Sequence, residues 1–200
     1  MCRAQRTCIL TLILAAPGCA GHRPSYPTVS PAAGAGTLAL AQGTLDTKSR
    51  KYRAEFGTLV VRENRSNANS RLITIPVIRV PASDSNARAE PIFLLNGGPG
   101  LSNMDWSPRE YLLANHDLVM VGYRGVDGSS VLDCPEVETA AKGDGSNLLG
   151  ENSLRSLGAA WTGCASRLKD SGMDLDGYTT LEVVDDLEAV RKALGYERVN

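Results

Sequence analysis

A short glycine-rich loop is the segment of this sequence whose residue types most clearly allow chemistry. It comprises residues 96–100 (NGGPG) and directly follows the apolar run 92–95 (IFLL). Glycine lets backbone N–H groups approach a ligand with no Cβ atom in the way. In α/β proteins, ligands bind at loops that follow the carboxyl ends of strands. The backbone amides of this loop are therefore candidates for ligand binding.

Three interpretations of the loop remain open on its residues alone. A phosphate-binding loop would need a lysine followed by serine or threonine, or a GxGxxG pattern, and the loop has neither. Pro99 also removes one amide donor. An oxyanion hole needs only one or two N–H groups aimed at a developing negative charge, which such a loop can supply. The third interpretation is a tight turn without chemistry.

Composition and charge exclude several classes of partner. The chain has 200 residues, of which 42% are hydrophobic and 22% charged, as in a typical globular domain, and its net charge is −1. Because it has no basic surplus, a nucleic-acid partner is not expected. The five cysteines lack zinc-binding spacing, so neither a metal nor another cofactor is expected. Only two histidines are present, His22 near the N-terminus and His116 before an apolar strand.

The N-terminus has the layout of a secretory signal peptide. Residues 1–19 combine a basic start with an apolar run that is too short to span a bilayer. Cys19 stands in a partial lipoprotein cleavage box, because Gly18 fits the pattern whereas Ala16 and Pro17 do not. We expect export to the cell envelope with a lipid anchor on Cys19 that binds the membrane. The alternative is ordinary cleavage, which would leave a soluble secreted or periplasmic protein.

The remainder divides into a tether and a folded domain. Residues 20–51 are rich in Pro, Gly, Ala, Ser and Thr and are predicted to be a flexible tether. Residues 52–200 are predicted to fold. Apolar runs predict strands at 56–62, 72–80, 92–95 and 117–123, and helical spacing predicts helices at 105–115, 154–169 and 179–194. This alternation favours a mostly parallel α/β sheet.

The last helix has the clearest sequence signals. Thr179 and Glu182 have the spacing of a capping box at its N-terminus. Apolar residues from Leu181 to Leu194 recur at helical spacing and are expected to cover the sheet. Asp186 and its acidic neighbours are expected to face solvent.

The order of these features resembles the α/β-hydrolase fold, and specifically the prolyl aminopeptidase and tripeptidyl aminopeptidase group. The similarity covers roughly residues 56–200. The loop 96–100 is similar to the HGGPG loop of that family, and residues 122–129 (GYRGVDGS) are similar to its DQRGxGxS turn. Two cysteines and the segment YTT…DLEAVRKALGYERVN complete the match. Asn96, Gly122 and Tyr123 depart from it, since the family usually has His, Asp and Gln there.

The resemblance implies the N-terminal part of an exported serine hydrolase. It implies that Gly98 donates an N–H group to the oxyanion, that Gly97 shapes the loop, and that Arg124 and Ser129 hold the second turn by binding loop carbonyls. The implied substrates are peptides that lose N-terminal residues, proline among them, or short peptides, with small amides and esters as further candidates. No GxSxG elbow occurs in these 200 residues. The serine, aspartate and histidine of a triad are thus missing, and the chain alone is expected to be inactive.

Other functions stay open beside this one. The chain could be a non-catalytic exported lipoprotein, a binding module on a hydrolase scaffold, or one half of a split enzyme. Cys134 and Cys164, the only cysteines of the predicted folded part, are expected to form a disulfide, because disulfides persist in exported proteins. Two buried free thiols are the alternative.

Overall fold

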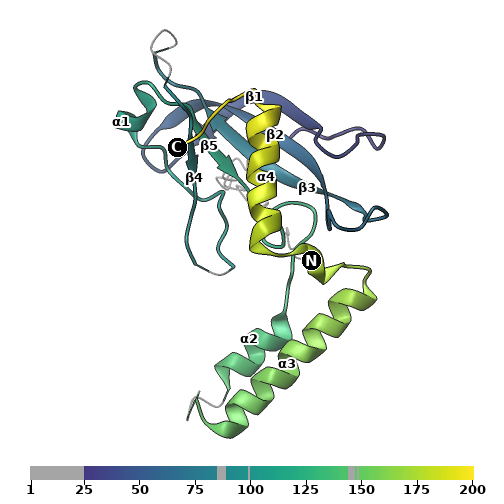
Figure 1. Ribbon diagram of the computed structural model, residues 1–200. Coiled ribbons are helices and arrows are strands. Elements are labelled where there is room, and N and C mark those ends of the chain that lie inside the picture. Colours follow the sequence, from purple (N-terminus) through teal and green to yellow (C-terminus); the bar gives the residue numbers. More distant parts are fainter. Residues whose placement is uncertain (1–24, 85–88, 99, 144–146, 148) are drawn as a thin grey trace, which may run out of the picture.

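The computed structural model describes residues 25–84, 89–98, 100–143, 147 and 149–200 (Figure 1). The predicted signal peptide at 1–19, the lipidation candidate Cys19 and Pro99 lie outside these residues. Within them, a five-stranded sheet carries a long helix on one face, and a helical pair projects away from the sheet.

The sheet is mixed and has the strand order β1-β2-β3-β5-β4. Its strands are β1 (Leu38–Asp46), β2 (Lys51–Arg62), β3 (Leu72–Val80), β4 (Ile92–Leu94) and β5 (Leu118–Val121). The pairs β1–β2, β2–β3 and β3–β5 are antiparallel, whereas β4 and β5 are parallel.

This sheet corrects the predicted fold class. It is mostly antiparallel, not the mostly parallel α/β-hydrolase sheet that the sequence suggested. The prediction was wrong because strand–helix alternation begins only after β3. Before that point, β1, β2 and β3 follow one another through short connections at 47–50 and 63–71. Strands joined by a tight turn run antiparallel, since a parallel pair needs a long crossover.

The folded part also begins earlier than the predicted boundary at Tyr52. β1 lies within the predicted tether 20–51 and pairs with β2 along its whole length. Ahead of it, the ring of Tyr26 packs edge-on against Phe56 at 5.8 Å between centroids, and the Thr58 hydroxyl donates a hydrogen bond to the carbonyl oxygen of Pro27. The small Ala and Gly residues of β1 are weak strand formers, so only its pairing partner makes this segment a strand.

Two apolar clusters lie on opposite faces of the sheet. All four residues of β5 are buried. Because side chains alternate along a strand, Leu118 and Met120 enter one cluster, and Val119 and Val121 enter the other. The second cluster includes Val190 of the last helix, which covers that face (Figure 1). The continuous apolar run in the sequence therefore reflects burial on both faces.

The first of the three predicted helices is much shorter in the structure, and the helices at 135–142 and 175–177 were not predicted. The helices are α1 (Glu110–Leu113), α2 (Pro135–Lys142), α3 (Glu151–Asp170), the 3-10 helix η1 (Leu175–Gly177) and α4 (Thr180–Ala193). The segment 105–115, predicted as a helix, forms only the single turn α1. Pro108 explains the late start, because proline disfavours helical geometry in the residue before it.

Helix α4 keeps its predicted N-cap, but only the C-terminal part of its predicted apolar stripe, Leu187 to Leu194, packs against the sheet. The Thr179 hydroxyl accepts a hydrogen bond from the amide of Glu182, which confirms the N-cap, whereas the Glu182 carboxylate contacts Arg65. Val190 is fully buried, but Leu181 remains 76% exposed. Asp186, predicted to face solvent, is only 1% exposed. The inward face thus carries acidic side chains as well as apolar ones, and the cations that they meet are described with the site.

Strand β4 forms one edge of the sheet, with β5 between it and β3. The backbone of Asn200 lies along this edge: its amide donates to the carbonyl of Pro91, and its carbonyl accepts from the amide of Phe93, each at 2.9 Å. This alternation of bonds is the pattern of a parallel pair. The end of the described chain therefore begins to pair with β4.

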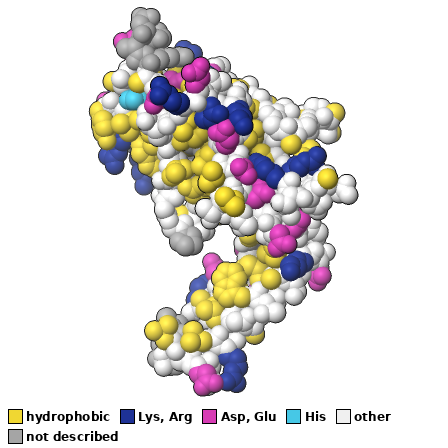
Figure 2. All heavy atoms as spheres, viewed as in Figure 1, with side chains coloured by type: hydrophobic (Ala, Val, Ile, Leu, Met, Phe, Trp, Pro, Cys, Tyr) yellow, Lys and Arg dark blue, Asp and Glu magenta, His cyan; other side chains and the backbone are white. Residues whose placement is uncertain are grey.

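Helices α2 and α3 form an arm that extends away from the sheet (Figure 1). Figure 2 shows a hollow between the arm and the body, and hydrophobic side chains along the arm. Leu154 and Trp161 of α3 are 50% and 56% exposed, whereas α2 has no buried residue. Apolar burial alone is therefore a weak source of stability for this arm.

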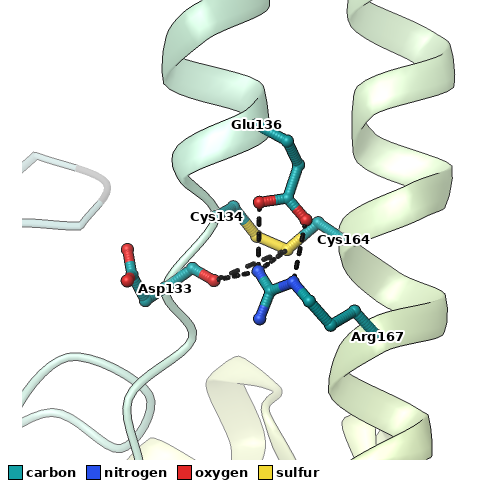
Figure 3. Close-up of a disulfide and its surroundings, with 5 residues drawn as sticks. All are labelled: Asp133, Cys134, Glu136, Cys164 and Arg167. Atoms are coloured by element: carbon teal, nitrogen blue, oxygen red, sulfur yellow. Dashed lines mark hydrogen bonds and ion pairs between the residues drawn. A yellow bond between two sulfur atoms is a disulfide. The ribbon is translucent and has the colours of Figure 1, made fainter.

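A disulfide joins the two helices of the arm, which confirms the predicted pairing of Cys134 with Cys164 (Figure 3). The Cα atoms are 5.6 Å apart, and the bond links residues 30 apart in sequence. Beside it, Arg167 donates to both carboxylate oxygens of Glu136 and to the carbonyl of Asp133. These bonds from Arg167 hold the pKa of the Glu136 carboxyl below its ordinary value.

We predict that replacing both Cys134 and Cys164 by serine destabilises the arm. Loss of the constraint on the unfolded chain costs about 3–4 kcal/mol for a loop of this length. Amide hydrogen exchange should accelerate throughout α2 and much less in β2 and β3, whose cores are separate. Equal protection of α2 in the variant and in the parent would contradict this account. The variant Ser156→Ala on the exposed side of α3 serves as the control.

Candidate functional site

The glycine loop leaves the sheet at the carboxyl ends of β4 and β5. β4 ends at Leu94, which pairs with Met120 near the end of β5. Residues 96–98 and 100 follow, and Gly97 and Gly98 are exposed. The loop thus lies at the edge of the sheet where the sequence analysis placed it. Both glycines therefore lie at the surface rather than in the core.

The backbone at Gly98 has a conformation that suits glycine. Its φ is +106°, and a Cβ atom built there would lie 2.6 Å from Cδ1 of Leu101. Nothing lies within 4 Å of a Cβ built at Gly97. Among the described residues, neither glycine amide donates a hydrogen bond to the protein. With respect to the described residues, both N–H groups are therefore free to meet an external acceptor.

Asn103 holds the base of the loop in place. Its side chain is only 1% exposed. The Nδ2 group donates to the carbonyl oxygens of Leu94 at 2.9 Å and Val121 at 2.8 Å, which are the last residues of β4 and β5. The Oδ1 atom accepts from the amide of Asn96 at 2.7 Å. One buried amide side chain thus closes the gap between the two parallel strands where they diverge.

Asp127 connects the turn at residues 122–129 to the glycine loop. Its carboxylate accepts from the hydroxyl of Ser102 at 2.7 Å, from the amide of Asn103 at 3.2 Å and from the amide of Tyr123 at 2.8 Å. Hydrogen bonds to a charged acceptor are stronger than those between neutral groups. Asp127 therefore links the segment after β4 with the segment after β5.

The three positions that depart from the aminopeptidase pattern contact this same network. The Tyr123 hydroxyl donates to the carbonyl oxygen of Asn96 at 3.0 Å, and the Asn96 side chain donates to the carbonyl of Ser102 at 3.1 Å. A Cβ at Gly122 would lie 2.7 Å from both Asp127 Cβ and Pro76 Cγ. A larger residue at 122 would therefore displace Asp127. The three departures thus act together to fix the loop and the turn beside it.

Arg124 and Ser129, the predicted turn residues, both reach other segments. The Arg124 guanidinium donates to the carbonyls of Glu63 at 2.6 Å and Gly177 at 2.5 Å. The Ser129 hydroxyl accepts from the amide of Thr74 at 2.8 Å. Neither side chain bonds to the glycine loop among the described residues, so they hold the second turn against β3, η1 and the connection after β2.

Arg124 is the centre of a buried ionic cluster that the sequence did not reveal. It is 5% exposed, and it donates from Nε and Nη2 to the two oxygens of Asp186, each at 2.7 Å. Arg65 lies beside it and contacts both Asp186 and Glu182. These cations explain why the acidic face of α4 points inward. Burying an ion pair is tolerated when its remaining donors and acceptors are bonded, as they are in this cluster.

Glu63 forms a second buried ionic contact next to this cluster. Its side chain is 1% exposed and accepts from Arg71, from the Tyr178 hydroxyl and from the amide of Asp174. Burial by itself raises the pKa of the Glu63 carboxyl, but these hydrogen bonds outweigh burial, so its pKa lies below the ordinary value. Burial and the bond to Glu63 raise the pKa of the Tyr178 hydroxyl.

His116 and the loop lie at opposite ends of β5. The Nδ1 atom of His116 bonds to the carbonyl oxygen of Glu90 at 2.6 Å, ahead of β4 and β5.

In the part of the chain that the structure describes, no three His, Cys, Asp or Glu side chains are grouped to hold a metal ion. No described helix has the length and apolar character needed to cross a membrane.

The structure thus separates the predicted residues into two groups. Gly97 and Gly98 lie in the loop, whereas Arg124 and Ser129 support it only through the turn that carries Asp127. Sequence reasoning missed Asn103 and Asp127 as the residues that position the loop. No local pattern marks them, because Asn103 lies nine residues beyond the end of β4, Asp127 lies six residues beyond the end of β5, and their roles depend on partners in other segments. The ionic partners of Arg124 come from distant segments and had no local signal.

Comparisons with known proteins do not assign the chain to a family. No protein-family model matches it, and no curated protein matches it. The resemblance to aminopeptidases therefore depends on the residues quoted in the sequence analysis.

We predict that Asn103→Ala destabilises the protein by about 3 kcal/mol. The change leaves the carbonyls of Leu94 and Val121 and the amide of Asn96 without their partner, and each unsatisfied buried group costs roughly 1–3 kcal/mol. Urea unfolding measures the loss. Asn69→Ala, at an exposed turn position, is the matched control and should change stability by less than about 0.5 kcal/mol. Equal effects of both variants would disprove the positioning role of Asn103.

The lowered pKa of Glu63 predicts a pH-dependent difference between the parent and Glu63→Gln. A carboxyl whose pKa is lowered by folding stabilises the fold above its ordinary pKa, which is 4.5 for this group. That stabilisation is lost as the pH falls through the folded-state pKa. At pH 7, Glu63→Gln should unfold more easily by about 1–3 kcal/mol. Urea titrations between pH 7 and pH 3 should show that the difference in unfolding free energy between the parent and the variant narrows below pH 4.5. A constant gap would show that the charge of Glu63 makes no contribution.

Proposed function

We propose that this chain supplies the oxyanion-binding loop of an exported serine hydrolase of the aminopeptidase type. The single observation that carries the proposal is the exposed glycine pair Gly97–Gly98, which follows a loop base held by the buried side chain of Asn103 at the carboxyl ends of β4 and β5. The similarity of residues 96–100 and 122–129 to the aminopeptidase motifs supports it. The proposed substrates are peptides that lose N-terminal residues, or small amides and esters.

The chemistry of such a site explains the rigid base of the loop. When a nucleophile attacks a carbonyl group, negative charge develops on its oxygen, and prearranged N–H donors stabilise that charge without having to reorganise. Asn103 and Asp127 fix the segments on both sides of the loop, so the Gly98 amide keeps its direction. Gly98 is the proposed donor, and Gly97 leaves open space for the substrate.

The nucleophile, base and orienting acid of this proposed enzyme are not among the 200 residues, because no GxSxG elbow is present. They would come from further sequence of the same protein or from a second polypeptide. The pairing of Asn200 with the edge of β4 gives a place where an additional strand could extend the sheet. The chain contributes the loop, and the completed protein contributes the triad.

We predict that the 200-residue chain alone does not hydrolyse proline- or alanine-naphthylamide or a short nitrophenyl ester. Removing a triad lowers the rate roughly a millionfold. The second arm of the experiment captures the native protein from its source cells with an antibody against this chain. A fluorophosphonate probe should then label an activated serine in the captured material.

A substitution at Gly98 connects that labelled enzyme to the loop. In the completed protein, Gly98→Val should lower kcat/KM by about a hundredfold to a thousandfold, as expected for loss of an oxyanion donor. Ala68→Val, on an exposed turn, is the control and should leave the rate unchanged. Captured material without a labelled serine would refute the proposal and favour a binding module. Turnover by the chain alone that survives Gly98→Val would refute it as well.

A further inference from the structure

The outer edge of β1 is an open pairing surface, and we propose that it joins a second copy of this chain to form a symmetric dimer. β1 is the terminal strand of the sheet and pairs only with β2 among the described residues. This inference concerns assembly and does not depend on the proposed hydrolase activity, because β1 and the glycine loop lie on different strands.

The bonding pattern between β1 and β2 shows which backbone groups point outward. Thr37 is the residue before β1, and its carbonyl oxygen accepts a hydrogen bond from the amide of Val60 at 2.9 Å. This bond lies one residue before the first pair of the ladder, Leu38 with Leu59. In an antiparallel pair, bonded and non-bonded positions alternate along each strand. The backbone N–H and C=O groups of the odd-numbered residues of β1 therefore point toward β2. The outward N–H and C=O groups belong to Leu38, Leu40, Gln42, Thr44 and Asp46.

The sequence of this edge lacks the features that usually prevent strand pairing. Natural edge strands carry lysine, proline or a bulge, or are very short. β1 has nine residues, and its sequence LALAQGTLD contains no proline and no charge before Asp46. Asp46 is itself paired with Lys51 at 3.1 Å. Leu40 is 44% exposed. This edge is therefore long, nearly uncharged and partly apolar.

The two edges of the sheet differ in what covers them. At β4, the backbone of Asn200 already bonds to Pro91 and Phe93. At β1, no described residue outside β2 forms a backbone hydrogen bond with the strand. The open edge is thus the one formed by β1 (the purple strand in Figure 1).

A second copy fits this edge because β1 is self-complementary about its middle residue. When two copies pair antiparallel around Gln42, Leu40 lies opposite Thr44 and Leu38 lies opposite Asp46. No like charges then face each other, so the arrangement avoids the repulsion that destabilises cross-strand pairs. A twofold axis through Gln42 makes the same patch meet itself, as in most dimers of identical chains. The two sheets become one, with both α4 helices on the same face.

Sedimentation velocity of the purified protein tests the dimer directly. At ~100 µM, a concentration suited to a small interface, the main species should have twice the monomer mass. Gln42→Pro removes an outward amide without breaking a backbone bond to β2, so it should convert the dimer to monomer. It also removes the hydrogen bond from the Gln42 side chain to Glu55 at 2.6 Å, so Gln42→Ala, which loses only that bond, is its matched control and should remain dimeric. Ala68→Pro, on an exposed turn, is the control for introducing proline and should remain dimeric. A monomeric parent, or a dimer that persists in Gln42→Pro, overturns the proposal.

Cross-linking tests the proposed register. In the symmetric pair, two Gln42 residues face each other with Cα atoms about 5.5 Å apart, which is within the range of a disulfide. Under mild oxidation, Gln42→Cys should therefore form a covalent dimer. Thr44→Cys is the matched control, because its two copies would lie about 14 Å apart along the strands and should not cross-link. The parent chain gives the background from its own cysteines. Stronger cross-linking at position 44 than at position 42 overturns the pairing.

Discussion

The buried guanidinium of Arg124 is the interaction on which the arrangement of segments depends most. It follows β5, and it binds the carboxylate of Asp186 on α4 together with the carbonyls of Glu63 and Gly177. A charge removed from water is strongly destabilising unless it is paired and its donors are bonded. The β2–β3 connection, η1 and α4 must therefore reach Arg124 together. This requirement also sets which face α4 turns to the sheet.

The turn that carries Arg124 also carries the residue that organises the glycine loop. Asp127 lies three positions further on and bonds to Ser102, Asn103 and Tyr123. The close approach of this turn to β3 depends on Gly128, since a Cβ there would lie 2.1 Å from the carbonyl oxygen of Thr74. The buried ionic cluster and the candidate oxyanion loop are thus connected through one turn, in which Arg124 binds the cluster and Asp127 binds the loop. A disturbance of the scaffold would move the loop as well.

The sheet and the arm are stabilised in different ways. The sheet buries apolar side chains on both faces, and Val119 and Met120 of β5 are completely removed from water. The arm buries little beyond Cys164 and Leu168, so its disulfide and the Arg167–Glu136 contact hold α2 against α3. A covalent bond that restricts the unfolded chain substitutes there for a missing core. The two parts can therefore respond independently to reduction and to denaturant.

The sequence by itself determined most of the local elements, the disulfide partners and the position of the glycine loop after an apolar strand. Hydrophobic periodicity and the Thr179 cap are local signals. The predicted bounds of β3, β4 and β5 agree with the structure to within two residues, whereas β2 begins five residues before its predicted start. Strand direction, the strand β1, the inward face of α4 and the supporting roles of Asn103 and Asp127 were decided only by the tertiary structure. Each depends on a partner far away in the chain, such as β2 for β1 or Arg124 for Asp186. Neither propensity nor periodicity records which distant groups will meet, because that depends on how the buried polar groups are jointly satisfied.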